Sequence, residues 1–531
     1  MKRKLSILAL TVMLLTSMLC LPASAAVNKT GLPITDEVVT LTVLFPRKAS
    51  HGDFDQMWYM DELEARTNIR LDFKLADASG FTEKKNLAFA SDDYTDIMFN
   101  SLSTSDIAAL GAQGILVDLK PYLAEYAPNI VHLLNTVSDT AWMTVTSPDG
   151  AIYALPTFNT VERDQIQDTR IFINKQWLDN LGLAAPTTLT ELYDVLKAFR
   201  DQDANGNGDP TDEIPLVGRS AQAVNRLVLC ALGYTRDRED FIDGEYIYVP
   251  TTDAYREYLT YMNKLYTESL LDKDYFTQTT EQYNAKLVDM RAGICMNPQA
   301  TMPSPEQYEQ YLFIPALKNE KTGERIWPRE ASFGAGFGTL LAVTNKCQNV
   351  EAAVRLADYL TTVEGTILTR CGNEYGTLEH DGGYEQYEED GVVKYRLHNN
   401  GFSNYGAYRY SISPMDIIHT FSPEINAIIV ANDPQNQFLT DQTYASGNLE
   451  VMREEIPNII LSAEDSDRLA FLVDLNSYVD QMDAKFITGM LEINDETWAS
   501  FQQDLQALRV DELIRIKQAA YTNALRMMNK E

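Results

Sequence analysis

Residues 201–213 carry the most regular pattern of potential metal ligands in the sequence. Carboxylate and amide side chains alternate along this segment, with Gly206 and Gly208 between them. Ca2+ takes roughly six to eight oxygen ligands from a tightly folded backbone, so this alternation indicates a calcium loop. The expected ligands are Asp203, Asn205, Asn207, Asp209, Asp212 and Glu213, and an alternative register adds Asp201.

Two registers of this loop fit the spacing, and the residues alone do not separate them. One begins at Asp201 and places Gly206 at the sixth position, whereas the other begins at Asp203 and places Gly208 there. A turn rich in Asp and Asn that binds no ion is the structural alternative.

The position of the loop indicates what an ion would do there. Residues 187–203 follow a helical pattern with a capping sequence at the start, so the loop lies at a helix exit. Extracellular loops of this type bind Ca2+ with a Kd of about 0.1–1 mM, so about 1 mM Ca2+ adds only about 0.4–1.4 kcal/mol of stability. We therefore expect a structural ion and not a catalytic one.

Sequence signatures of catalysis are missing elsewhere in the chain. The five histidines form no HExxH motif. The glycine run at residues 334–339 precedes a predicted strand, whereas a phosphate-binding loop follows a strand. Paired carboxylates for glycoside hydrolysis remain open, because only their separation in space is diagnostic.

Aromatic and polar residues gather where predicted strands end. Ligands of open α/β sheets bind beyond the carboxyl ends of strands, where flat rings can contact a sugar and polar neighbours can bind its hydroxyls. For any single ring, packing in a core is as consistent with the pattern. The candidate ligand-binding residues are Phe45, Arg47, Trp58, Asn100, Phe158, Asn159, Trp327, Tyr405 and Tyr408.

Strands and amphipathic helices alternate along most of the chain, which predicts a parallel α/β sheet. Residues 38–45 form a run rich in β-branched side chains, and a helical pattern around residues 54–69 follows it. From about residue 405 the pattern is mostly helical. The chain has 531 residues. Single cores stop growing at roughly 250–300 residues, so we expect two or more compact units.

The first 25 residues predict a signal peptide, with Lys2, Arg3 and Lys4 before an apolar run and a small-x-small cleavage site. Lipidation at Cys20 is the alternative mode of export. Residues 26–36 read as a polar tether, and no later run is long and apolar enough to span a membrane. The net charge is -32 without a basic stripe, which argues against nucleic acid as a partner.

Four cysteines follow the predicted signal peptide, at positions 230, 295, 347 and 371. They form no CxxC pair and lie in apolar or loop contexts, so we expect buried free thiols. An exported protein could form disulfides, and Cys347 with Cys371 is the first pairing to test.

Four stretches in order carry a family resemblance: "GILVDLKPYLAEYAPNI" from Gly114, "DGAIYALPT" from Asp149, "FINKQWLDNLGLAAPTTLTELYDVLKAFRDQDANGNGDPTDEIPL" from Phe172, and "NVEAAVRLADYLTTVEG" from Asn349. With them the chain resembles the extracellular solute-binding proteins of ABC importers, family 1, in the carbohydrate branch that includes LplA-like and alginate-binding proteins. The third stretch is the most specific. In that branch the calcium loop is structural, which favours the register beginning at Asp203.

The resemblance implies a type II periplasmic-binding-protein-like fold, in which two discontinuous α/β lobes close about a hinge. The first lobe is expected to hold residues 37–155 and 311–370, and the second residues 156–310 and 371–531. The extended runs at residues 150–158 and 311–317 are candidates for crossing between the lobes.

The resemblance also implies a monomeric, non-enzymatic protein, secreted or held at the cell surface. It would capture a carbohydrate, which we expect to be an oligosaccharide, and deliver it to an ABC permease. An extracellular carbohydrate-active enzyme is one alternative. The same fold binding a peptide, or serving a sensor partner, is the other.

Overall fold

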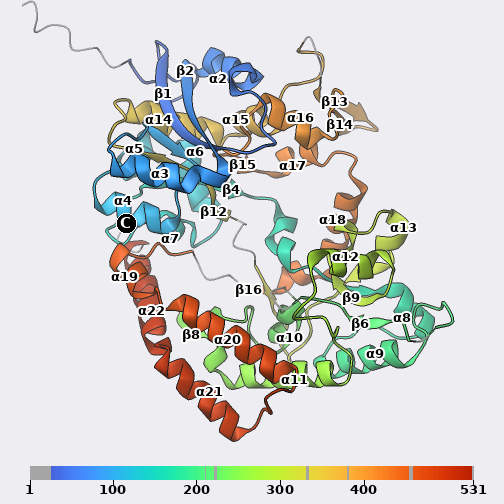
Figure 1. Ribbon diagram of the computed structural model, residues 1–531. Helices are drawn as coiled ribbons and strands as arrows, with labels where there is room; N and C mark the ends of the chain where they lie inside the picture. Colours follow the sequence, from blue (N-terminus) through green and yellow to red (C-terminus); the bar gives the residue numbers. More distant parts are fainter. Residues whose placement is uncertain are drawn as a thin grey trace, which may run out of the picture.

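The computed structural model describes residues 25–209, 211–219, 224–329, 334–378, 382–453 and 458–528, and it forms two lobes (Figure 1). We call the part built on a six-stranded sheet the first lobe and the part built on a four-stranded sheet the second lobe. Residues 1–24, with Cys20 and nearly all of the predicted signal peptide, lie outside the described residues.

The sheet of the first lobe joins segments from three distant parts of the chain. Its order is β15 (Thr420–Phe421), β4 (Ala154–Asn159), β12 (Gly334–Val343), β3 (Ile97–Phe99), β1 (Val39–Arg47) and β2 (Ile69–Asp77). The glycine run noted in the sequence lies inside β12. Strands β1, β2 and β3 are parallel, but β12 runs antiparallel to both of its neighbours. The expected parallel sheet is thus mixed, because β12 enters this lobe on return from the second one.

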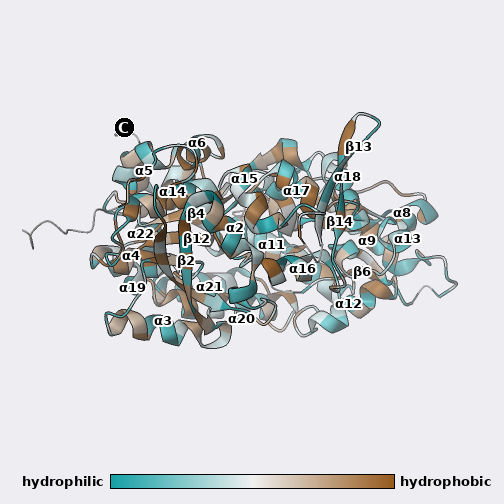
Figure 2. Ribbon diagram, turned by 90° about the horizontal axis from the view of Figure 1, so that it is seen from above, coloured by the Kyte–Doolittle hydropathy of each residue, from teal (hydrophilic) through white to brown (hydrophobic). Residues whose placement is uncertain are grey.

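Helices cover both faces of this sheet, and the hairpin β13–β14 projects at its periphery (Figures 1 and 2). Helix α14 packs against α5, α6 and β12, whereas α7 packs against β12 and β4. The elements are α2 (Trp58–Thr67), α3 (Phe81–Ala90), α4 (Thr104–Ala112), α5 (Lys120–Tyr126), α6 (Pro128–Thr136), α7 (Ala141–Val145), α14 (Val350–Leu360), α15 (Val363–Thr366), β13 (Gly383–Glu389), β14 (Val392–His398), α16 (Tyr405–Ile412) and α17 (Pro423–Ile429).

The sheet of the second lobe has the order β10 (Tyr311–Phe313), β5 (Ile171–Asn174), β9 (Ala292–Met296) and β6 (Ile214–Leu216). Helix α9 begins after Thr188, whose hydroxyl accepts a hydrogen bond from the Glu191 backbone, as the capping pattern predicts. The helices are α8 (Lys175–Leu181), α9 (Leu189–Asp201), α10 (Val224–Ala231), α11 (Asp253–Thr267), α12 (Thr280–Val288), α13 (Pro305–Tyr308), α18 (Pro434–Ser446), α20 (Leu472–Ile487) and α21 (Asp495–Ala507).

Tight packing in the second core makes Gly293 of β9 sensitive to substitution. A Cβ atom there would lie 2.6 Å from both the Phe199 ring and the Pro215 carbonyl oxygen. We expect Gly293→Ala to lower the free energy of unfolding by about 1–3 kcal/mol, because the backbone oxygen cannot turn away. Urea unfolding measures the change. Gly80→Ala is the control, since its Cβ would meet open space, and an equal loss in both variants would contradict the packing argument.

Within the described residues the chain passes between the lobes after β4, after β10 and after α17, and residues 460–468 contact the first lobe again before the chain returns to the second lobe. The predicted division differs from this in two respects. Strand β10 pairs antiparallel with β5, so the second lobe continues past residue 310. Strand β15 pairs with β4, and Ile417 and Ile418 are fully buried in the first core, so the first lobe continues past residue 370. The two extended runs lie within sheets, and the crossings follow them.

The C-terminal helices reconnect the two lobes (Figure 1). Helix α22 (Val510–Met528) contacts β8 (Glu245–Tyr248) of the second lobe and α7 of the first, and α19 (Ala463–Arg468) contacts α4. The four described cysteines are free and buried, as expected, and burial raises the pKa of Cys230 and Cys371 to about 12. Within the described ranges, no helix has the length and apolar character needed to cross a membrane.

Candidate functional site

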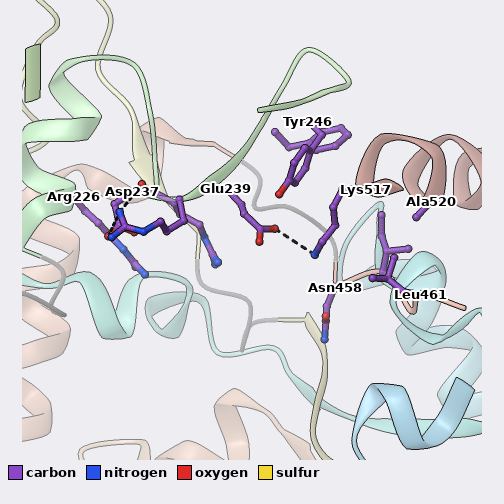
Figure 3. A pocket seen from close by; sticks show the side chains of 12 residues that line it. Arg226, Asp237, Glu239, Tyr246, Asn458, Leu461, Lys517 and Ala520 are labelled. Carbon is purple, nitrogen blue, oxygen red and sulfur yellow. Dashed lines mark hydrogen bonds and ion pairs between the residues drawn. The ribbon is translucent and has the colours of Figure 1, made fainter. Parts of the chain in front are cut away.

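A cavity of about 500 Å3 lies where the second lobe meets α22 and the segment 458–461 (Figure 3). Among the described residues, two aromatic rings, six charged side chains and one amide contribute to its walls. The lining residues are Arg226, Arg236, Asp237, Arg238, Glu239, Phe241, Tyr246, Asn458, Ile459, Leu461, Lys517 and Ala520.

One wall of this cavity is attached to the first lobe. Ile460 is only 2% exposed and packs in a cluster of the first lobe with Leu44 and Met98. Its neighbours Ile459 and Leu461 line the cavity, whose other residues come from the second lobe and α22. A movement of one lobe relative to the other would therefore change the shape of the cavity.

The aromatic wall comes from the hairpin of β7 (Glu239–Ile242) and β8. Asp243 and Gly244 connect the strands with φ angles of 53° and 83°, the left-handed backbone that an Asp-Gly hairpin turn adopts. In this register Phe241 is paired with Tyr246, and both line the cavity.

Helix α22 is fixed on this hairpin by one side chain. The Gln518 amide accepts a hydrogen bond from the Tyr246 backbone at 2.7 Å and donates one to the Gly244 carbonyl at 2.9 Å. Lys517 and Ala520, three residues apart on one helix face, consequently point at the cavity. The Lys517 ammonium lies 3.3 Å from the Glu239 carboxylate.

Asp240 holds the loop that carries the arginines. Its buried carboxylate accepts hydrogen bonds from the backbone and hydroxyl of Thr235, at 2.7 and 3.1 Å, and from the Phe241 backbone at 2.8 Å. The Arg453 guanidinium donates to the same carboxylate at 2.6 Å and to the Gly233 carbonyl at 3.0 Å. The backbone of residues 236–238 is thereby pinned at both ends.

Arg238 separates this cavity from a second one of about 400 Å3, and the two share Asp237 and Arg238. Its guanidinium donates to the Tyr255 hydroxyl at 2.8 Å and to the carboxylates of Asp480 and Asp483 at 2.5 and 3.0 Å. The remaining lining residues of the second cavity are Asn225, Tyr258, Tyr275, Phe276, Asn476, Asp480, Asp483 and Ile487.

The family of bacterial extracellular solute-binding proteins matches residues 48–367, more than half of the chain. The chain belongs to this family. A curated relative is the fructooligosaccharide ABC transporter substrate-binding protein FusA of Streptococcus pneumoniae, 24% identical over 499 residues, which are 89% of this chain and 88% of FusA.

Solved structures agree with the two-lobed fold of this solute-binding protein. FusA in complex with kestose has a TM-score of 0.67 at 23% identity, covering 92% of this chain and all of that chain. An extracellular solute-binding protein from Bifidobacterium longum subsp. infantis has a TM-score of 0.72 at 22% identity, covering 93% and 100%. Together these likenesses confirm the predicted type II fold and its two discontinuous lobes.

The nine predicted ligand-binding residues do not line either cavity of this solute-binding protein. Five of them belong to the cores. They are Phe45, Phe158 and Trp327, each 0% exposed, with Tyr405 at 8% and Tyr408 at 2%. The Tyr405 hydroxyl donates to the Cys371 carbonyl and that of Tyr408 to the Asn373 side chain, so both polar ends are already bonded. These five side chains are thus packed within the protein, and their contact with a ligand stays a prediction.

The other four predicted residues lie near strand ends of the first lobe. Arg47 ends β1 and is exposed, and Trp58 begins α2 half-buried against the first core. Asn100 follows β3 with a φ of 45°. Asn159 donates to the Asp164 carboxylate at 3.3 Å. Their contact with a ligand stays a prediction.

Residues that the sequence did not suggest dominate the cavity instead, above all its arginines. The run "TRDRED" (residues 235–240) was the available signal in the sequence, because five of its six residues are charged. Three of these are acidic and two are arginines. Arg226 and Lys517 had no comparable signal, because only the fold brings α10 and α22 to this loop.

The predicted calcium loop folds its oxygen atoms inward. The Asp203 carboxylate accepts from the backbones of Asn207 and Gly208, at 3.0 and 2.9 Å. The Asp212 carboxylate accepts from the side chains of Asn205 and Asn207, at 3.0 and 2.9 Å. These contacts bring together four of the predicted ligands, Asp203, Asn205, Asn207 and Asp212, and the Asn205 backbone also donates to Glu213, the fifth.

Glu213 gives the loop its best fit to a cation. One of its carboxylate oxygens accepts from the Asn205 backbone at 3.3 Å, and the other is buried without a hydrogen-bond partner. Burial raises the pKa of Glu213. A bound cation would satisfy the second oxygen and favour the ionised form.

The two remaining predicted ligands point elsewhere. Asp201 pairs with Arg200 at 2.6 Å, and the Asp209 side chain accepts from the backbone and hydroxyl of Thr211. In the part of the chain that the structure describes, no three His, Cys, Asp or Glu side chains are arranged to hold a metal ion. A cation in this loop would therefore need amide or backbone oxygens as well.

The contact between Arg238 and Asp483 makes stability depend on pH. Burial raises the pKa of Asp483 to about 6, against the opposing effects of Arg238 and Tyr255. Because the folded pKa exceeds the ordinary value of 3.8, the folded state retains this proton between about pH 4 and 6 while the unfolded chain loses it. The contribution of the Asp483 carboxyl group to the free energy of unfolding therefore falls by about 3 kcal/mol as the pH rises through that window.

Asp483→Asn tests this pH dependence, since the amide stays neutral at every pH. Relative to the native protein, the variant's free energy of unfolding should rise between pH 4 and pH 7. Asp480→Asn, at a carboxylate that is 69% exposed, is the control. If the free energies of unfolding of the native protein and of Asp483→Asn changed with pH in parallel, Asp483 would have the same pKa in the folded and unfolded chains, which would contradict the prediction.

Proposed function

We propose that this solute-binding protein is the substrate-binding component of an ABC importer, which captures an oligosaccharide between its lobes and hands it to a membrane permease. The cavity of about 500 Å3 carries this proposal. Its size suits a small ligand of a few sugar rings, and its walls combine rings with hydrogen-bonding groups. The similarity to a fructooligosaccharide-binding protein over 89% of the chain supports the same reading.

Capture follows from the attachment of the cavity walls to different lobes. A ligand that contacts both the β7–β8 hairpin and residues 458–461 binds more tightly when the lobes are closed. The binding free energy therefore shifts the population toward the closed form, which the permease would recognise. The rings of Phe241 and Tyr246 would contact a sugar face, while the charged groups fix its orientation.

Isothermal titration calorimetry with defined oligosaccharides tests this function. We expect saturable binding of at least one glycan at one site per chain, with the glycan recovered unchanged by chromatography. Peptides of similar size should not bind. Cleavage of the glycan would instead support an extracellular carbohydrate-active enzyme.

Export is part of the proposal. The family is extracellular by description, and residues 1–25 have the pattern of a signal peptide. Mass spectrometry of the mature N-terminus distinguishes cleavage after residue 25 from lipidation at Cys20. A protein that keeps residues 1–25 would contradict export by this signal.

We also propose that the loop at residues 203–213 binds Ca2+ as a structural ion, with Asp203, Asn205, Asn207, Asp212 and Glu213 among the ligands. The unpartnered oxygen of Glu213 supports this. Among similar structures, FusA has been solved as an EF-hand mutant and the alginate-binding protein AlgQ2 without calcium ion. The loop follows α9 on the second lobe, and none of its described residues, 203–209 and 211–213, lines either cavity.

Removal of Ca2+ should lower the Tm by about 1–5 °C and leave ligand affinity nearly unchanged, because the linkage free energy at about 1 mM Ca2+ is small. Thermal unfolding with added Ca2+ or EGTA measures the shift. Glu213→Gln should abolish it, whereas Asp201→Asn should retain it. Loss of glycan binding on chelation would place the ion in the ligand site.

A further inference from the structure

The hydroxyl of Tyr246 is a polar group in the cavity wall that stays unsatisfied in the described part of the chain. Tyr246 is only 4% exposed, and its hydroxyl is buried without a hydrogen-bond partner. Burial raises the pKa of Tyr246, so the hydroxyl keeps its proton and can donate. The nearby Glu239 carboxylate raises this pKa further, yet it accepts no hydrogen bond from the hydroxyl. A ligand group that bonded to the hydroxyl would relieve this unfavourable state.

Glu239 and Lys517 form an ion pair beside this hydroxyl. Their charged atoms are 3.3 Å apart, longer than the about 2.7–2.9 Å of a close charge-assisted hydrogen bond. The two side chains are 24% and 29% exposed, so a ligand can reach both. Figure 3 shows the pair at the cavity, with the Tyr246 hydroxyl directed toward it. The three groups thus offer one charged acceptor and two donors to the same part of the cavity.

Two contacts of α22 fix these groups relative to one another. The Gln518 amide bonds to the hairpin of β7 and β8 on both sides, and Lys517 is the preceding residue. The Tyr521 ring packs against the Phe241 ring, with their centroids 4.0 Å apart and an angle of 55° between the planes. Donors and acceptor are therefore preorganised, which lowers the entropy that a ligand must lose on binding.

The chemistry of the pair restricts the ligand. The Glu239 carboxylate can only accept a hydrogen bond and the Lys517 ammonium can only donate one, so a ligand that satisfies both needs a donor beside an acceptor. Neighbouring hydroxyls of a sugar ring meet this need, at a spacing close to that of the two charged atoms. Glu239 would repel a carboxylate, Lys517 would repel an ammonium group, and an ether oxygen could bond only to Lys517. A neutral diol is the best match.

We propose that Glu239, Lys517 and Tyr246 bind a vicinal diol of a neutral glycan. One hydroxyl of the diol donates to Glu239, and its neighbour accepts from Lys517 and Tyr246. Phe241 is paired with Tyr246 across the hairpin and lines the same cavity, where its ring can contact the C–H face of the sugar. This inference rests on the proposed function, because it names the class of glycan that the cavity takes and the side chains that select it.

A panel of trisaccharides tests the class of ligand. Kestose, maltotriose and xylotriose are neutral, whereas trigalacturonate is an acid with the same number of sugar units. Calorimetry on the full mature chain should show that a neutral trisaccharide binds at least about tenfold more tightly than the acid, because Glu239 repels a carboxylate. Tighter binding of trigalacturonate than of every neutral trisaccharide would overturn the assignment.

Monodeoxy analogues of the tightest neutral trisaccharide locate the diol. Removal of either of two adjacent hydroxyls should weaken binding by about ten- to a hundredfold, the effect of a hydrogen bond to a charged group. For one of the two hydroxyls, this loss should nearly vanish in Lys517→Met. Identical losses in the native protein and in Lys517→Met would contradict the proposed contact. The analogues test the native protein even if a variant does not fold.

Tyr246→Phe distinguishes a role in binding from a role in folding. It removes only the unsatisfied hydroxyl, so affinity for the neutral trisaccharide should fall about two- to tenfold while the urea midpoint is retained or rises. Tyr248→Phe on the same strand is the matched control, because the Tyr248 hydroxyl already donates to the Asn476 side chain at 3.1 Å. This control should lower the urea midpoint and retain the affinity.

The outcomes separate this inference from the function on which it rests. Binding of a neutral trisaccharide that neither Tyr246→Phe nor Lys517→Met weakens would overturn the diol site and leave oligosaccharide capture in place. Absence of binding to every neutral and acidic glycan would overturn the proposed function as well.

Discussion

Replacement of Asp240 by alanine is expected to lower the free energy of unfolding by about 3–5 kcal/mol and to abolish glycan binding. Asp240 is only 2% exposed, and its carboxylate accepts four hydrogen bonds, one of them from the Arg453 guanidinium. Without the Asp240 carboxylate, the Arg453 guanidinium would lose the charged acceptor to which it donates. The loop 235–238 would lose the contacts that hold its arginines at the cavity.

Two variants separate the role of Asp240 from a general effect on the hairpin. Glu245→Ala changes an exposed carboxylate on β8 and should leave both stability and binding nearly unchanged. Asp240→Asn keeps one acceptor oxygen, replaces the other with an NH2 donor and removes the charge, so its loss should be intermediate. Urea unfolding and calorimetry measure the two effects. Native-like binding by Asp240→Ala would show that the loop holds its shape unaided.

Replacement of Arg163 by alanine is expected to cost about 2–4 kcal/mol of stability and to loosen the lobes. Arg163 lies in η3 (Glu162–Thr169), on the first crossing between β4 and β5. Its guanidinium donates to the Asn426 side chain at 3.1 Å, in α17 of the first lobe. It also donates to the Asn436 carbonyl at 3.2 Å and the Thr440 hydroxyl at 2.6 Å, in α18 of the second lobe. One buried side chain thus joins the crossing after β4 to the crossing after α17.

The effect of Arg163 should appear in lobe closure as well as in stability. Without ligand, we expect small-angle X-ray scattering to show a broader distribution of interatomic distances for Arg163→Ala than for the native protein. Its glycan affinity, measured by calorimetry, should also be weaker, because more of the binding free energy is needed to hold the two lobes in the closed arrangement. Glu162→Ala, an exposed neighbour that accepts a hydrogen bond from Tyr444, is the matched control. Unchanged dimensions and affinity in Arg163→Ala would show that the other crossings determine the hinge.

Local patterns in the sequence predicted the elements well where the chain stays within one lobe. The strand and helix expected from residue 38 onward became β1 and α2, and the loop at residues 201–213 does follow a helix. The direction of β12 and the membership of β10 and β15 were not predictable from such patterns. These features depend on which sheet strand the chain pairs with after each crossing between the lobes, and the periodicity of the side chains carries no information about that pairing.

The candidate site was harder to predict than the fold for a similar reason. Their positions at the ends of predicted strands made Phe45 and Phe158 candidate ligand contacts, but a residue at a strand end can turn toward either the core or the ligand. The cavity residues come from four distant parts of the chain, around residues 226, 236–246, 458–461 and 517–520. Only tertiary packing, through contacts such as those of Gln518 and Asp240, brings them together.

Capture of an oligosaccharide between two closing lobes is tested most directly by small-angle X-ray scattering of the mature protein during titration with a glycan that calorimetry shows to bind. The radius of gyration should fall saturably, with a midpoint at the calorimetric Kd, because the ligand holds the wall at residues 458–461 against the β7–β8 hairpin. A radius of gyration that stays constant through saturation would contradict the account.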